Sequence, residues 1–246
     1  MPGKEINVEL SPDTTIFWQW GPVVLNATLV YTWVVMAVLA VGSWLITRNL
    51  SVEPEISRWQ SALETIVSFI RDEIRDIAQQ DATPYLPFVG TLFLFISLSN
   101  MLDIVPYFDA PTSSLSTTAA LALCVFVAVP AYGISQDGMV AYLKNYIEPT
   151  PLMAPFHIIS EFSRTLALAV RLFGNVMSGG LIVVILLSVV PLFLPIVLSA
   201  LGLLIGQIQA YIFAVLAMVY IASGISAREH QSRRKTERRI ESHGSN

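Results

Sequence analysis

Four stretches of this chain contain no charged residue at all, and their lengths limit what the chain can fold into. They cover residues 14–47, 82–102, 110–136 and 172–227. A helix needs about 20 apolar residues to cross the hydrocarbon core of a bilayer. The first three stretches each have room for one such helix, and the last has room for two. The pattern therefore predicts an all-α membrane protein with about five transmembrane helices in a single membrane domain.

The composition agrees with this class of protein. Hydrophobic residues make up 54% and charged residues 13% of the 246 residues, a profile typical of membrane proteins. The predicted spans are residues 22–47, 84–105, 117–135, 165–190 and 195–226. The start of the chain is polar and acidic and does not resemble a signal peptide, so we expect the first span to be retained.

Two segments outside the spans have their own patterns. Residues 54–80 place apolar side chains at helical spacing among arginines, aspartates and glutamates. This predicts an amphipathic helix, too charged to cross the membrane, that lies either on the cytoplasmic surface or against a partner. Residues 228–246 are basic and lack apolar periodicity, so we expect a disordered tail.

The basic residues are distributed unequally between the connections. The segment after the first span contains four arginines and the C-terminal tail contains six basic residues, whereas the N-terminus has only Lys4. Loops on the cytoplasmic side of a membrane are enriched in Lys and Arg. The distribution predicts an N-terminus outside the cell, or in the periplasm, and a C-terminus in the cytoplasm.

A helix over about residues 154–190 would carry its polar side chains on one face, because they recur three or four residues apart. We call this set the polar stripe. Its members are His157, Glu161, Arg164, Arg171, Asn175 and Ser178. Such a helix would be roughly 55 Å long against a hydrocarbon core of about 30 Å. It must therefore be steeply tilted, broken or partly interfacial.

Arg171 constrains function most strongly. Inserting an arginine into the middle of a span costs about 2.5–3.5 kcal/mol on insertion scales, so intramembrane charges generally mark functional sites. Residues 172–227 contain no carboxylate that could pair with it. One half of a structural ion pair is the alternative to a functional arginine. We infer the functional role and expect the partner carboxylate in another chain. Arg164 is nearer the cytoplasmic entry, and snorkelling to headgroups explains it as well as a functional role does.

The last predicted helix offers a surface that faces this stripe. Its small and polar residues at helical spacing include Ser199, Gly202, Gly206 and Gln209, together with Phe213. Small residues permit close helix packing in a membrane, and glutamines provide hydrogen bonds. Gln207 and Gln209 are therefore either functional groups or partners in interhelical structural bonds.

These residues also form motifs. The segment "SRTLALAVRLFGN", followed by an apolar run, a proline-containing turn and "QAYIFAVLAMVYIASG", resembles the most characteristic region of subunit a of F-type ATP synthases. The segments "LFLFISLSNMLDIVPY" and "PTSSLSTTAALAL" resemble the second span and the outer loop of the same family. The resemblance covers about residues 22–228.

The resemblance implies a membrane stator subunit beside a rotating ring of c subunits, with one ion half-channel from each side of the membrane. The last two helices would form a long, tilted hairpin facing the ring. Implied partners are the c ring, b-type peripheral stalk subunits, other ATP synthase subunits and the lipid bilayer, in a bacterial inner membrane. The chain would not be an enzyme by itself, and we expect no cofactor, no metal site and no nucleic acid partner.

The resemblance also assigns roles to residues. Arg171 matches the family's essential arginine, which faces the ring carboxylate. Asn175 and Gln209 match positions near that arginine and the ring, and Asn100 and Asp103 match polar positions on the outer side. Asp103 is the first candidate for the outer path, with Ser178, Asn175 and Gln209 along it, while His157 and Glu161 border the inner end. The expected ring interface includes Gly202, Gly206 and Arg164.

The sequence departs from many relatives at two positions of the outer path. A glutamate of the family corresponds to Gly180 here, and a histidine found in some bacterial relatives corresponds to Gly202. A sodium-coupled synthase is therefore an alternative to a proton channel. Two other classes, a secondary transporter with an anionic substrate at Arg171 and a purely structural anchoring subunit, are further alternatives.

Overall fold

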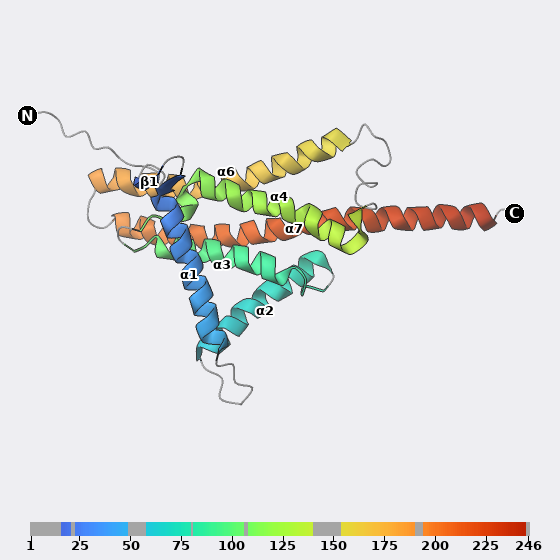
Figure 1. The fold of residues 1–246 in the computed structure, drawn as a ribbon, viewed down its shortest axis with the longest axis horizontal. Helices are drawn as coiled ribbons and strands as arrows, with labels where there is room; N and C mark the ends of the chain where they lie inside the picture. Colours follow the sequence, from blue (N-terminus) through green and yellow to red (C-terminus); the bar gives the residue numbers. More distant parts are fainter. Residues whose placement is uncertain are drawn as a thin grey trace, which may run out of the picture.

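The computed structural model describes residues 16–20, 23–48, 58–79, 81–105, 108–139, 154–189 and 194–244 (Figure 1). The elements in chain order are β1 (Ile16–Trp20), β2 (Val23–Asn26), α1 (Ala27–Thr47), α2 (Arg58–Ala78), α3 (Leu86–Leu102), the short 3-10 helix η2 (Pro111–Ser113), α4 (Leu115–Asp137), α6 (Ala154–Val189) and α7 (Leu194–Gly244). The predicted all-α membrane fold is confirmed, with one short antiparallel pairing of β1 with β2 added to it.

Four helices among the described residues are long and apolar enough to cross a membrane. They are Ala27–Thr47, Leu115–Ser135, Pro155–Leu186 and Ile196–Ser223. The remaining apolar helix, α3, has 17 residues, which is the lower end of the length that spans a bilayer. The predicted span over residues 84–105, which corresponds to α3, therefore stays a prediction.

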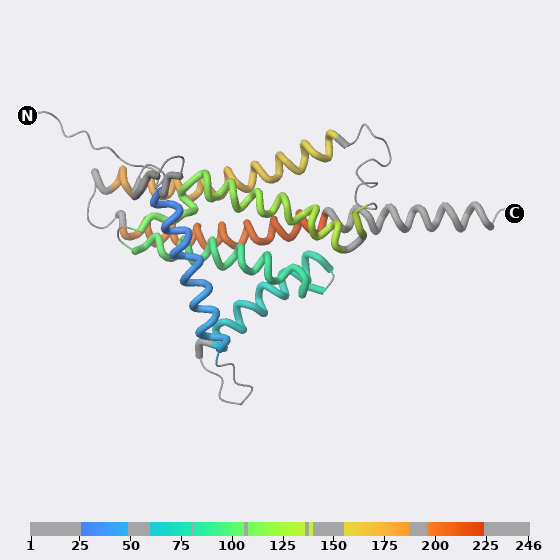
Figure 2. Tube along the Cα trace, viewed as in Figure 1, coloured from blue at the N-terminus to red at the C-terminus, as the bar shows by residue number. Residues whose placement is uncertain are grey.

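The helices form a bundle around α7. Figures 1 and 2 show α3, α4, α6 and α7 running lengthwise beside one another, while α1 crosses them. α7 packs on α2, α3, α4 and α6, and α4 packs on α6. If α1 runs along the membrane normal, then α6 and α7, which cross α1, are strongly tilted from that normal. The length of α6 predicts the same tilt.

Close packing around α7 follows from its small residues. Gly206, Ala210, Ala214 and Ala217 are buried and recur at helical spacing. Without a large side chain at these positions, neighbouring helices approach the α7 backbone closely, which is how helices associate inside membranes. The apolar core on this side includes Leu92, Phe95 and Ile96 of α3, Ala122 and Val125 of α4, Leu168 and Leu172 of α6 and Phe213 of α7.

The amphipathic segment forms α2, and part of its apolar face packs inside the chain. Ile70 and Ile74 are 6% and 1% exposed and pack with residues of α3 and α7. The charged face, which includes Arg71 and Asp72, is exposed. The structure thus packs the second half of the apolar face on the chain's own α3 and α7, while Ile66 and Phe69 are 39% and 51% exposed. The position of α2 on the membrane surface or against a partner stays a prediction.

A short turn joins α2 to α3. The Asp81 carboxylate accepts hydrogen bonds from the Thr83 backbone N–H at 3.2 Å and from the Thr83 hydroxyl at 2.9 Å. These bonds stabilise the ionised form, so they lower the pKa of the Asp81 carboxyl. Pro87, at the first turn of α3, is compatible with a helix start because the N–H groups there have no intrahelical acceptor.

Two boundaries differ from those predicted. Residues 23–26, expected at the start of the first span, pair with β1 as an extended strand, and α1 begins only at Ala27. α7 continues as helix to Gly244 instead of ending before a disordered tail. No proline or glycine interrupts residues 225–243, and Arg, Glu, Lys and Gln have high helix propensity.

Candidate functional site

Arg171 lies in the middle of the longest candidate span. The span covers Pro155–Leu186 of α6, so about half of its residues precede the arginine and half follow it. Leu168 and Leu172, on the neighbouring turns, are 1% and 0% exposed and fix one side of the helix against the bundle. The Arg171 side chain lies beside this packed side and is exposed at the surface of the subunit.

The outer face of α6 beside Arg171 is apolar. Val170 and Leu166 are 53% and 54% exposed. Among the residues that the structure describes, no hydrogen bond or ion pair joins the Arg171 guanidinium to another side chain. Lipid offers a guanidinium no hydrogen-bond acceptor in the hydrocarbon region. The site is therefore complete only with an acceptor from outside the described residues or with water.

The other polar side chains of the stripe lie along the same edge of α6. Asn175 and Glu161 are half-buried, while His157 and Ser178 are exposed. The Ser178 hydroxyl donates to the Asn175 backbone carbonyl at 3.2 Å, which is a bond within the helix. The stripe thus forms a polar margin between the packed face of α6 and its apolar outer face.

Arg164 contacts α7. Its guanidinium lies 5.5 Å from the centre of the Tyr220 ring, and one of its nitrogens lies 3.5 Å from the Ser223 hydroxyl. A cation over an aromatic ring is attracted by the negative face of the ring. These contacts add a third interpretation of Arg164 to snorkelling and a functional role. The side chain holds α6 on α7.

The two glutamines of α7 have different environments. The Gln207 side chain accepts a hydrogen bond from the Ser97 hydroxyl and donates one to the Ser97 backbone carbonyl at 3.0 Å. Gln207 is thus a structural residue, whose side chain makes the interhelical hydrogen bonds between α7 and α3. Gln209 is 7% exposed, and its Nε2 makes no hydrogen bond within the described part of the chain.

Asn100 joins three elements. Its Nδ2 donates to the Gly206 backbone carbonyl of α7 at 2.7 Å, and its Oδ1 accepts from the Thr112 hydroxyl of η2 at 3.3 Å. Gly206 is buried against Asn100. This differs from the place expected for Gly206 at the ring interface, because the missing side chain makes room for the Asn100 amide inside the subunit.

Asp103 follows the last residue of α3. Its carboxylate accepts a hydrogen bond from the Ala110 backbone N–H at 3.0 Å and so holds the connection that leads to η2. Among the described residues, no hydrogen bond or ion pair connects Asp103 with Arg171, Asn175 or Gln209. The structure therefore brings Arg171 and Asn175 together on α6 but leaves Asp103 separate.

Gly180 and Gly202, the two positions of the predicted departure in the outer path, are open. Gly180 and Gly202 are both exposed, and a Cβ built on either would meet nothing within 4 Å. Packing inside the subunit does not require glycine at either position.

Several polar partners were not predicted from the sequence. Ser97 and Thr112 complete the bonds of Gln207 and Asn100, and Glu73 of α2 accepts a hydrogen bond from Tyr211 of α7. Serine and threonine are common in membrane helices, where they bond to their own backbone, so their presence alone gives no signal. Glu73 falls at the border of the apolar face of an amphipathic helix. That position is the one feature of the sequence that could have indicated a contact with another helix.

Comparison with known proteins decides the family. Residues 29–222 match the family described as ATP synthase A chain. The chain belongs to this family. It is similar to ATP synthase subunit a 1 of Crocosphaera subtropica, with 60% identity over 225 residues that cover 92% of this chain and 98% of the relative. Membership in the ATP synthase A chain family makes the chain a component of an ATP synthase, and its apolar helices make it a multi-pass membrane protein.

Two other relatives extend the similarity across bacteria. ATP synthase subunit a 2 of Acaryochloris marina is 61% identical over 223 residues, which cover 91% of this chain and 95% of the relative. ATP synthase subunit a of Albidiferax ferrireducens is 57% identical over 222 residues, covering 90% and 96%. The match extends over nearly the whole chain, so the resemblance of the motifs is confirmed at the level of the family.

Proposed function

We propose that this subunit is the ion-translocating stator of an F-type ATP synthase, a proton channel made of two half-channels separated by Arg171. One observation carries the proposal: a guanidinium lies at mid-span on the outer surface of α6, among exposed apolar residues, and has no acceptor within the described chain. A permanent charge at that depth requires a partner. A ring of c subunits that presents a carboxylate to α6 supplies one.

The chemistry follows from the charge of Arg171. A cation near the ring carboxylate favours its ionised form, so the carboxylate releases its ion as it passes the arginine. The same charge blocks direct passage of a cation from one half-channel to the other. Arginine suits this position because it keeps its charge after desolvation, whereas lysine readily loses its proton.

The polar residues divide into two proposed paths. On the outer side, Asp103 receives the ion, and Asn175, Ser178 and Gln209 hold water toward the ring. On the inner side, Glu161 and His157 border the exit near the start of α6. Gly202 lies on the open surface of α7 and fits the ring interface.

The proposed assembly places the α6–α7 hairpin against the c ring, with b-type stalk subunits and lipid on other faces. The distribution of Lys and Arg supports an N-terminus in the periplasm and a C-terminus in the cytoplasm of a bacterial inner membrane. ATP chemistry itself belongs to other subunits of the complex.

The test is ATP-driven pumping by the whole ATP synthase in inverted vesicles, followed with a pH-sensitive dye in sodium-free buffer. Arg171→Ala should abolish the dye response while the complex stays assembled, and Arg171→Lys should retain little of it. Arg71→Ala, which removes an exposed arginine from α2, is the matched control and should pump normally.

Unchanged pumping by an assembled Arg171→Ala complex would overturn the proposal and favour a structural anchoring role. A wild-type response that requires added sodium would contradict the proton channel and favour sodium coupling. Transport by the isolated chain without a c ring would instead support a secondary transporter.

A further inference from the structure

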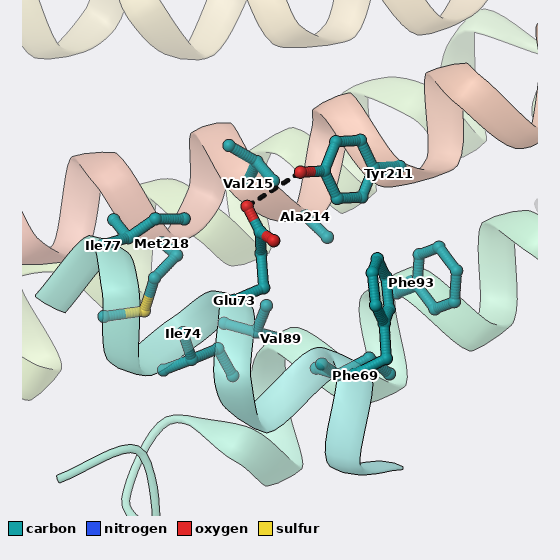
Figure 3. Close-up of a pocket in the computed structure, with 11 residues that line it drawn as sticks. Phe69, Glu73, Ile74, Ile77, Val89, Phe93, Tyr211, Ala214, Val215 and Met218 are labelled. Carbon is teal, nitrogen blue, oxygen red and sulfur yellow. Dashed lines mark hydrogen bonds between the residues drawn. The ribbon is translucent and has the colours of Figure 1, made fainter. Parts of the chain in front are cut away.

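Glu73 and Tyr211 form a polar pair inside an apolar pocket between α2, α3 and α7. The Tyr211 hydroxyl donates a hydrogen bond to the Glu73 carboxylate at 2.7 Å. Figure 3 shows the two groups pointing toward each other among the side chains of Val215, Met218 and Phe69, which line the same pocket. The pair is partly buried, and a hydrogen bond to a charged acceptor is stronger than one between neutral groups.

This pair is the second of two side-chain bonds on one face of α7. Gln207 is bound to Ser97 of α3, and Tyr211 is bound to Glu73 of α2. Residues four apart lie on the same face of a helix. Two bonds to two different helices, one turn apart, fix the rotation of α7 about its own axis at this level.

Gln209 lies midway between the two bonded residues. Two residues along a helix is a rotation of about 200°, so Gln209 lies on the opposite face of α7. Tyr220 follows Gln209 by about three turns and shares that face, and the ring of Tyr220 contacts Arg164 of α6. The face that carries Gln209 is therefore the one turned toward α6, which also carries Arg171.

The Nε2 donor of Gln209 has no partner among the described residues in this position. The side chain is 7% exposed, and its Nε2 has no hydrogen-bond acceptor among the described residues. A buried unsatisfied donor is unfavourable, so any rotation of α7 that offered this amide an acceptor would be favoured. The bonds on the opposite face oppose that rotation.

We propose that Tyr211 and Glu73 are positioning residues, which keep the Gln209 amide directed toward α6 and available to the ion path. The inference rests on the proposed function, because Gln209 matters to transport only if the chain carries ions past the arginine. Neither Tyr211 nor Glu73 touches the ion in this proposal. Their effect passes through the rotation of α7.

The test uses the whole complex in vesicles and measures the ratio of ATP-driven pumping to ATP hydrolysis. Tyr211→Phe should lower this ratio roughly two- to tenfold, the range expected for loss of one hydrogen bond, with normal amounts of assembled subunit. Glu73→Gln keeps an oxygen acceptor and should retain most of the ratio, whereas Glu73→Leu should lower it as Tyr211→Phe does. Tyr132→Phe removes a phenol hydroxyl that makes no hydrogen bond within the described chain, and it should have no effect.

A double variant separates positioning from simple packing. If Tyr211 acts through Gln209, then Tyr211→Phe with Gln209→Leu should pump no worse than Gln209→Leu alone, because interacting sites are not additive. Multiplication of the two losses would overturn the inference. Loss of assembled complex in Tyr211→Phe, with normal pumping by the complexes that remain, would also overturn it.

The same measurements distinguish the two proposals. If Arg171→Ala abolishes pumping but Gln209→Leu changes nothing, the positioning role fails while the role of Arg171 stands. If Arg171→Ala pumps normally, the proposed function itself fails, whatever the Tyr211 variants do.

Discussion

Asn100 of α3 fills the space that a side chain at Gly206 of α7 would need. Its amide donates to the Gly206 carbonyl at 2.7 Å, and a Cβ built on Gly206 would lie 3.1 Å from Asn100 Nδ2. Both residues are buried, so neither can turn toward solvent. Close approach of the two helices and the hydrogen bond between them therefore depend on the same glycine.

Gly206→Ala should lower the thermal midpoint of the solubilised complex. The added methyl group pushes against Asn100, and overpacking of this kind costs about 1–3 kcal/mol. Gly42→Ala in α1 is the matched control, because a Cβ there meets nothing within 4 Å, and it should leave the midpoint unchanged or slightly higher. Equal midpoints for the two variants would contradict the close contact.

Gln207→Leu should weaken the contact between α3 and α7. The variant removes both hydrogen bonds to Ser97, and interhelical bonds of side chains in membranes contribute about 0.6–2 kcal/mol. Ser97→Ala removes only the bond from the hydroxyl and should cost less. The double variant should be no less stable than Gln207→Leu alone in a thermal unfolding assay, and an additive loss would show that the two residues act independently.

Arg164→Lys should loosen the α6–α7 hairpin although the charge is kept. Lysine lacks the planar group that lies over the Tyr220 ring, and cation–π contacts contribute about 0.5–2 kcal/mol. Tyr220→Phe keeps an aromatic face and should be close to wild type, while Tyr220→Leu should resemble Arg164→Lys. The thermal midpoints of these variants measure the effect, and a normal midpoint for Tyr220→Leu would rule out the ring contact.

Asp103→Asn should slow ion transport without disturbing the fold. Asparagine retains an oxygen that accepts from the Ala110 N–H, so the connection to η2 stays in place, but the negative charge at the outer side is lost. Asp103→Ala removes the hydrogen bond as well and should also lower stability. Pumping in vesicles and the amount of assembled subunit are the two measurements, and normal pumping by Asp103→Asn would remove Asp103 from the outer path.

The apolar helices and the polar stripe could be predicted from the sequence because each depends on residues close together in the chain. The long uncharged stretches mark α1, α3, α4, the second half of α6 and the first part of α7, and helical spacing alone places Arg171, Asn175 and Ser178 on one edge of α6. Membranes strengthen this type of prediction, since every buried backbone group must be satisfied within its own helix.

The bonds between helices could not be predicted in the same way. Ser97 pairs with Gln207 and Glu73 with Tyr211 across more than 100 residues of sequence, and no local pattern states which helices meet. The same reason left the partner of α2 open, because an amphipathic face indicates contact without naming its surface. The helical continuation of α7 was missed for another reason: charged residues fit a solvated helix as well as a disordered tail.

The position of α7 in the chain bears on how the subunit is made. This helix is synthesised after α2, α3, α4 and α6, yet all four pack on it. Until α7 emerges and inserts, Asn100 lacks the Gly206 carbonyl, Ser97 lacks both of its bonds to Gln207, and Glu73 lacks its donor Tyr211. A nascent chain that stops early therefore has polar side chains without their partners on both α2 and α3, a feature by which a membrane protease could recognise it before it reaches an ATP synthase.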